Sequence, residues 1–139
     1  MDLRKPFDTY KDEFLDDAAF FVLRIGFGFG MLFGHGWGKL MKLMGDEPIK
    51  FMDFLGLGPT FSLGLVVFAE FFCSILLIIG LFTRWAAFFL IFTMCVAIFY
   101  KHLGDPFAEK AFLYLVAYVA IFMAGAGNYS VDARLGISH

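Results

Sequence analysis

The sequence predicts an all-α protein, an antiparallel bundle of four transmembrane helices. The first observation is composition, since 60% of the 139 residues are hydrophobic and the chain has 21 phenylalanines. An average soluble domain is roughly 45–50% apolar even with glycine counted, and a small fold leaves much of its surface wet. The second observation is that the apolar residues fall into four separate segments. Each is near the ~20 residues that a helix needs to cross the hydrocarbon core, where a lone strand would leave backbone groups unpaired.

The four segments form one domain, as the length of the chain favours. The predicted spans cover residues 18–42, 61–82, 85–102 and 111–127. Residues 1–17 precede them as a segment of mixed charge, and residues 128–139 follow as a C-terminal tail. The N-terminal segment has no short apolar run before a cleavage site, so it does not resemble a secretory signal. Phe7, Tyr10 and Phe14 recur at helical spacing and predict a short interfacial helix there.

The first span carries the stretch GFGFGMLFGHGWGKL, which combines glycines with ionisable side chains. An α-helix turns about 100° per residue, so residues four apart lie on one face. Rows of small residues at this spacing let transmembrane helices approach closely. We therefore predict a helix-packing row made of Gly26, Gly30, Gly34 and Gly38. A neighbouring polar stripe on the same helix contains Arg24, His35 and Lys39.

The links between the spans are short, apart from the first. An FTRW turn joins the second and third spans, which should therefore form an antiparallel hairpin. A Gly-Asp-Pro tripeptide at 104–106 breaks the chain before the fourth span. The long link, 45–60, contains Phe51, Phe54 and Leu55 at helical spacing and predicts a second short interfacial helix.

Four spans place both chain ends on one side of the membrane. Lysine and arginine favour the cytoplasmic side of short loops. The side of the termini leads by a single cation, so the expected orientation has cytoplasmic termini. The cations counted are Arg4, Lys5, Lys11, Arg84 and Arg134 on that side, and Lys42, Lys50, Lys101 and Lys110 on the other.

Glu70 lies inside the second span, where insertion scales give a cost of ~2.5–3.5 kcal/mol for a charged side chain. It should therefore face the bundle interior and be paired, hydrated or protonated. A rise of ~1.5 Å per residue puts Glu70 roughly 13 Å and His35 roughly 9 Å below the same surface, so the two can face each other. We predict a polar intramembrane pocket lined by Glu70, His35, Lys39, Arg24, His102 and Tyr114.

Each of these residues also has a purely structural interpretation. A hydrogen bond between Glu70 and His35 would fix the register of two helices. Arg24 and Lys39 lie near helix ends, where long side chains snorkel to the surface. His102 is at a helix end, and the tyrosines can belong to an interfacial aromatic belt. The sequence leaves both interpretations open.

Several common functions find no support in the sequence. A net charge of -2 does not favour nucleic-acid binding. Cys73 and Cys95 lie in separate apolar runs without a C-x-x-C pair, which indicates small core residues and no metal or dithiol site. No cofactor is evident, and no redox centre such as a Rossmann fingerprint or Fe–S spacing is visible. Haem between His35 and His102 is disfavoured, because His102 sits at a turn and bundle haem needs facing ligands.

Several motifs, in this order, resemble the DoxX family of small four-span membrane proteins. They are LRIGFGFGMLFGHGWGKL in the first span, FLGLGP before the second, AEFFCSILLIIGLFTRWAA across the second turn, and IFYKHL at the end of the third span. The family's HG-x-x-K element corresponds to His35-Gly36 and Lys39, and its acidic residue in the second span to Glu70. The resemblance covers nearly all of the chain from Leu23 onward.

The resemblance implies a redox-associated subunit in a bacterial inner membrane. One branch of the family resembles the small subunits of a thiosulfate:quinone oxidoreductase, and other members are thought to bridge soluble thiol and oxidant-defence enzymes at the membrane. The expected function is therefore an accessory subunit of a membrane redox system, with a quinone or small-thiol pocket near one membrane face. If the subunit is active, it is part of an oxidoreductase, and its electrons come from a partner or a bound cofactor.

Two other classes of function stay open. A non-catalytic scaffold would use the glycine row and the charged N-terminus as partner surfaces. A transporter of a small solute would need an oligomer, because four spans are few for a pore. The expected partners are the lipid bilayer, other membrane or membrane-associated proteins and further copies of the chain, with no nucleic acid among them.

Overall fold

The computed structural model describes residues 12–101, 104–105 and 107–137, and these residues form helices and loops without any strand. The prediction of an all-α protein is therefore confirmed for this part of the chain. The α-helices are α1 (Glu13–Met31), α2 (Trp37–Met44), α3 (Pro59–Val67), α4 (Ser74–Ile79), α5 (Thr83–Val96), α6 (Phe107–Ala124) and α7 (Val131–Leu135). Three π-helical segments interrupt them: η2 (Leu32–Gly36), η3 (Phe68–Cys73) and η4 (Ala97–Lys101).

The π-helical segments join the α-helices into three continuous helices of membrane-spanning length. These run over Glu13–Met44, Pro59–Ile79 and Thr83–Tyr100, and each is apolar enough to cross a bilayer. The first begins earlier than predicted because Asp12 caps it, accepting a hydrogen bond from the backbone nitrogen of Phe14 at 3.1 Å. Three helices of this length and apolar composition point to an integral membrane protein. A fourth span, placed on α6, stays a prediction.

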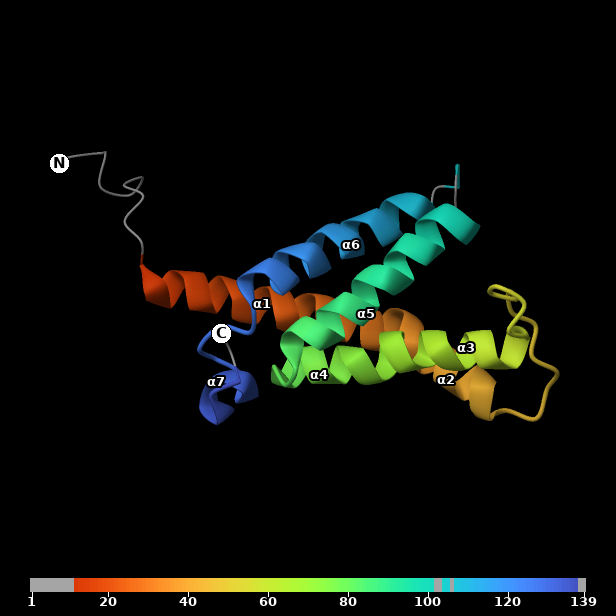
Figure 1. The fold of residues 1–139 in the computed structure, drawn as a ribbon, viewed down its shortest axis with the longest axis horizontal. Coiled ribbons are helices and arrows are strands. Elements are labelled where there is room, and N and C mark those ends of the chain that lie inside the picture. The colour runs from red at the N-terminus through yellow and green to blue at the C-terminus, as the bar shows by residue number, and fades with distance from the viewer. Residues whose placement is uncertain (1–11, 102–103, 106, 138–139) are drawn as a thin grey trace.

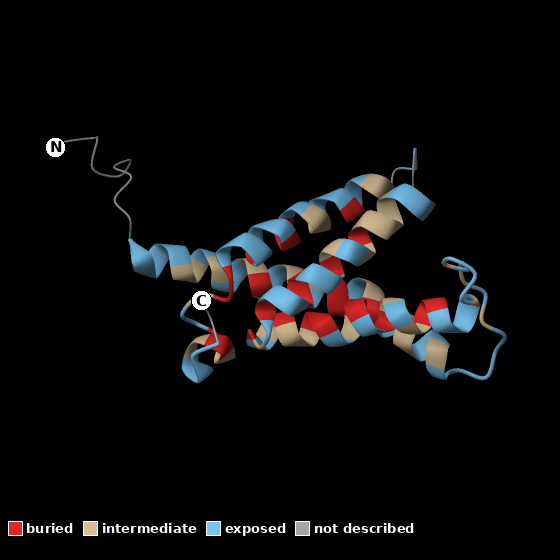
Figure 2. Ribbon diagram, viewed as in Figure 1, coloured by how far each residue is buried: buried red, intermediate tan, exposed pale blue. Residues whose placement is uncertain are grey.

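The long helices lie against one another in pairs (Figure 1). The continuous helix α1–α2 runs alongside α3–α4, and the α5–α6 hairpin crosses this pair at an angle. The buried residues, red in Figure 2, lie mainly where the helices meet, and the outward faces are largely exposed. Many exposed side chains are large and apolar, among them Phe29, Phe33, Phe92 and Phe122. An apolar exterior of this kind suits a protein whose surroundings are lipid.

The turn between α4 and α5 is as tight as predicted and requires unusual backbone angles. Gly80 ends α4 with a φ of 71° and Phe82 precedes α5 with a φ of 48°. Glycine has no Cβ, so it adopts this left-handed conformation at little cost. The chain reverses within three residues, 80–82, and α5 begins at Thr83.

The loop between α2 and α3 contains no helix, so the predicted interfacial helix there is wrong. Residues 45–58 instead fold back over the start of α3, where the backbone nitrogen of Phe54 donates to Ser62 Oγ at 2.9 Å. The Phe54 ring packs edge-on against Phe92 at 6.4 Å and Tyr100 at 5.8 Å between centroids. In this segment, contacts with residues far away in the sequence outweigh the local helical spacing of the apolar residues. The other predicted interfacial helix rests on Phe7 and Tyr10, which lie outside the described residues, while Phe14 is part of α1.

The C-terminal segment, predicted as a tail, contains a short helix, α7. Ser130 caps α7 by accepting from the backbone nitrogen of Ala133 at 3.1 Å. Asp132, which is buried, accepts from the backbone nitrogens of Phe82 at 2.7 Å and Thr83 at 2.9 Å. A carboxylate from α7 therefore satisfies donors at the start of α5, where the helix dipole also favours a negative charge.

Candidate functional site

The two ionisable residues that the sequence singled out first both lie in π-helical segments. His35 belongs to η2 and Glu70 to η3, and the two segments pack against each other. Isolated π-helical turns are rare inside α-helices, and those that occur are often found at functional sites. A Cβ built at Gly36 would lie 2.4 Å from the carbonyl oxygen of Glu70, so only glycine permits this approach. The close packing of the two helices thus occurs beside the chemistry-bearing side chains.

Glu70 forms an ion pair with Lys39 of α2. The Glu70 side chain is 5% exposed and that of Lys39 is 28% exposed. A buried carboxylate is costly unless it is paired, so the Lys39 ammonium group offsets part of the cost of burying Glu70, while Lys39 keeps partial contact with the exterior. The sequence placed these residues in one pocket but set His35, rather than Lys39, directly against Glu70.

A small polar cavity of about 80 Å³ adjoins this ion pair. The ring of His35 lies edge-on to Tyr114 of α6, with centroids 5.8 Å apart. Four of the predicted pocket residues, His35, Lys39, Glu70 and Tyr114, line this one cavity. Lys110 also lines this cavity and was not among the predicted pocket residues. Lys110 lies one helical turn from Tyr114 on the same face of α6, which is the signal that could have identified it. The complete lining is Met31, His35, Lys39, Glu70, Met94, Ala97, Lys110, Ala111 and Tyr114.

A larger apolar cleft of about 470 Å³ lies on the other side of the ion pair. Its volume is within the ~300–1,000 Å³ range of small-molecule sites. Helices α3 and η3 form one wall, α5 forms another, and Phe51, Met52 and Phe54 of the loop contribute a third side. The sequence did not predict that this loop would fold back to complete a cleft. Lys39 and Glu70 are its only charged lining residues in the described chain.

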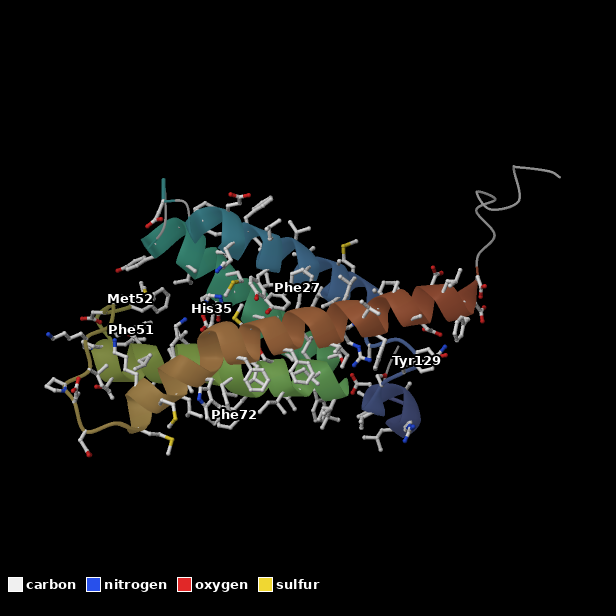
Figure 3. The ribbon with its side chains drawn as sticks, turned by 180° about the vertical axis from the view of Figure 1, so that it is seen from behind. Phe27, His35, Phe51, Met52, Phe72 and Tyr129 are labelled. Carbon is white, nitrogen blue, oxygen red and sulfur yellow. The ribbon has the colours of Figure 1, made fainter. Side chains whose placement is uncertain are left out.

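Arg24 belongs to a different cluster. It is fully buried, and its guanidinium donates to the carbonyl oxygens of Leu77, at 3.2 Å, and Tyr129. In Figure 3, Tyr129 of the C-terminal segment lies well away from His35, near the N-terminal end of the first long helix. The structure therefore does not bring Arg24 to the predicted pocket, because residues 24 and 35 lie three turns apart and Arg24 joins α1 to α4 and the C-terminal segment instead. His102 lies outside the described residues.

The glycines of the first helix divide into two groups. At Gly26, Gly34 and Gly38 an added Cβ would meet nothing within 4 Å, and at Gly30 it would lie 2.7 Å from the Tyr114 hydroxyl. Gly36, with Gly28, makes the close approach: a Cβ at Gly28 would be 2.6 Å from Ile78 Cγ1. Gly30 of the predicted row therefore contacts Tyr114, while the close approach to backbone is made at Gly36, outside the row. That the row packs against another helix outside this chain stays a prediction.

The arrangement can hold an apolar ligand with a polar end. The cleft offers aliphatic and aromatic walls, while the ion pair at its edge offers one hydrogen-bond donor and one acceptor. Beyond the ion pair, the His35 ring and the Tyr114 hydroxyl supply further hydrogen-bonding groups. A site that orients a lipophilic molecule usually has an apolar wall with a few polar groups.

Comparison with known proteins gives one match. The model of the family described as DoxX matches residues 19–103, which include α1 from its second turn, both π-helical segments that carry His35 and Glu70, and all of α5. No curated protein and no solved structure matches the chain.

Proposed function

The chain belongs to the DoxX family, and we propose that it is an accessory subunit of a membrane-bound redox system that binds a quinone in the apolar cleft. The observation that supports this most directly is the Glu70–Lys39 ion pair, which lines both the apolar cleft and the small polar cavity. A lipophilic ligand in the cleft would contact ionisable groups only at this edge.

The residues present fit a quinone. Aromatic and branched side chains of α3, η3 and α5 would hold its ring and tail and exclude water. Lys39 would donate a hydrogen bond to a ring oxygen, and Glu70 would accept one from a ring hydroxyl. When bound, a quinone accepts or releases electrons together with protons. His35 and Tyr114 would hold protons on the far side of the pair.

A small thiol fits this cleft less well than a quinone. Small thiols that circulate in cells are polar, whereas the cleft wall is almost entirely apolar. A polar molecule would lose hydration there without gaining hydrogen bonds beyond those of Lys39 and Glu70. The electrons in this proposal come from a partner protein, which the subunit brings to the membrane.

The proposal is tested on the complex purified with its partners in mild detergent. Quinone reduction is measured for the wild type, Glu70→Gln and His35→Ala. We expect a loss of at least about tenfold in Glu70→Gln and a smaller loss in His35→Ala, because only Glu70 lines the cleft itself. Val119→Ala, at an exposed position of α6, is the matched control and should keep wild-type turnover. Wild-type turnover in both test variants would refute the site.

A scaffold role is the second candidate, and one observation favours it. Three glycines of the first helix present backbone without any neighbour within 4 Å of a built Cβ. Such a surface permits a helix of another protein to approach closely. Under this alternative, Gly34→Leu abolishes co-purification of the partner, while Glu70→Gln leaves both co-purification and turnover unchanged.

A further inference from the structure

Besides the cleft and the small cavity, a hollow of about 540 Å³ opens where α2 meets the loop that follows it. Its lining consists of Lys39, Lys42, Lys50, Phe51 and Met52. The two lysines of α2 lie near the end of the first membrane-length helix, and the other three residues come from the loop. Figure 3 shows Phe51 and Met52 side by side in this loop, beyond His35. The hollow therefore lies at one end of a spanning helix, where a headgroup region is expected.

The charges around the hollow favour an anion. Among the residues that the structure describes, all three ionisable lining residues are cationic and none is acidic. Lys39 is paired with Glu70, and Lys42 donates to the backbone oxygen of Lys50. The exposed acidic residues of the same loop lie outside the lining; they are Asp46, Glu47 and Asp53, and Asp53 accepts from the backbone nitrogen of Gly58 at 2.8 Å. Cations gathered around one hollow repel each other, and an anion placed between them removes that repulsion.

We propose that this hollow binds the phosphate headgroup of an anionic membrane lipid. A lipid is favoured over a free phosphate because Phe51 and Met52 also line the apolar cleft, so apolar surface continues directly from the lysines. Basic pockets beside transmembrane helices are typical binding places for anionic lipid headgroups. An acyl chain would contact the two apolar residues while the phosphate lies among the lysines. The site does not require a quinone in the cleft.

The experiment measures which lipid stays bound to the purified full chain. The protein in detergent is given equal amounts of phosphatidylglycerol and phosphatidylcholine with identical acyl chains, and retained lipid is counted by native mass spectrometry. We expect preferential retention of phosphatidylglycerol. Lys50→Gln should reduce this preference about fivefold, and Lys42→Gln with Lys50→Gln by about 25-fold. Lys50→Gln alone keeps the backbone oxygen of residue 50, so Lys42 can still donate its hydrogen bond to the loop.

The matched control removes two exposed cations elsewhere, with Arg84→Gln and Arg134→Gln, and should keep the wild-type preference. Equal retention of both lipids by the wild type would overturn the proposal, as would an equal loss in the control pair. A competition measurement distinguishes a lipid site from a site for free phosphate. Glycerol phosphate at millimolar concentration should leave the bound lipid in place, and its displacement of the lipid would make this a phosphate site instead. Circular dichroism of every variant establishes that the helices are retained.

Discussion

Gly36 lies against the backbone of Glu70, so close that a Cβ added at Gly36 would be 2.4 Å from the Glu70 carbonyl oxygen and 2.9 Å from the nitrogen of Phe71. Both glycine and glutamate belong to π-helical segments. A π-helical turn leaves backbone groups displaced from the regular α-helical pattern, and here two such turns face each other. The position of the Glu70 carboxylate therefore depends on the absence of a side chain on the neighbouring helix.

Replacing Gly36 with alanine should destabilise the protein. The added methyl group meets backbone rather than a flexible side chain, so the two helices must separate, at a cost of about 1–3 kcal/mol. Gly34→Ala is the matched control, since a Cβ there meets nothing within 4 Å. It should be neutral or more stable, because alanine has the higher helix propensity. Thermal unfolding in detergent, followed by circular dichroism, compares the two. Equal midpoints for both variants would contradict the close packing.

The two halves of the ion pair should contribute unequally. Lys39→Gln leaves the 5% exposed Glu70 carboxylate without its partner, whereas Glu70→Gln leaves Lys39, which is 28% exposed and can extend outward. We expect Lys39→Gln to cost about 2 kcal/mol and Glu70→Gln about 1 kcal/mol, values reduced for the partial exposure of the lysine. The double variant should recover part of the loss. A double-mutant cycle from unfolding measurements gives the coupling, and strictly additive losses would exclude a stabilising pair.

Filling the apolar cleft should prevent a lipophilic ligand from binding without unfolding the protein. Val66, half-buried in the cleft wall, becomes tryptophan in the test variant. Val119→Trp, at a 39% exposed position of α6, is the control for the added indole. Binding of a short-chain quinone is measured by the thermal shift of each protein. We expect the shift to vanish in Val66→Trp and to persist in the control, and persistence in both would place the ligand elsewhere.

Removing the carboxylate of Asp132 should loosen the start of α5. Asp132→Ala deprives the backbone nitrogens of Phe82 and Thr83 of their acceptor, which costs about 1–2 kcal/mol. Asp132→Asn keeps one amide oxygen and should lose less. Arg134→Ala, exposed on the same short helix, is the control and should change the unfolding midpoint little. Hydrogen exchange at residues 82 and 83 should quicken in Asp132→Ala alone; unchanged exchange would show that water replaces the cap.

The sequence predicted well whatever depends on local composition. The membrane class and the approximate limits of the first three long helices follow from runs of apolar residues, which need no knowledge of distant contacts. Depth counting along regular helices put His35 and Glu70 at similar levels, and both residues line the small cavity. The predicted interfacial helix at 45–60 is wrong because Phe54 packs against Phe92 of α5 and Tyr100 of η4, far away in the chain.

The partners of each polar side chain depended on contacts that no local pattern contains. A π-helical turn inserts about one extra residue, which rotates every later position by about 100° relative to a regular helix. Inside the first such segment, Gly36 approaches the backbone of Glu70, whereas Gly28 precedes that segment and approaches the side chain of Ile78. Arg24 joins α4 and Tyr129 because the C-terminal segment returns to that end of the molecule. Amino-acid order thus determined that the chain is helical and apolar, whereas packing between distant segments determined that Lys39 faces Glu70 and that a cleft opens beside them.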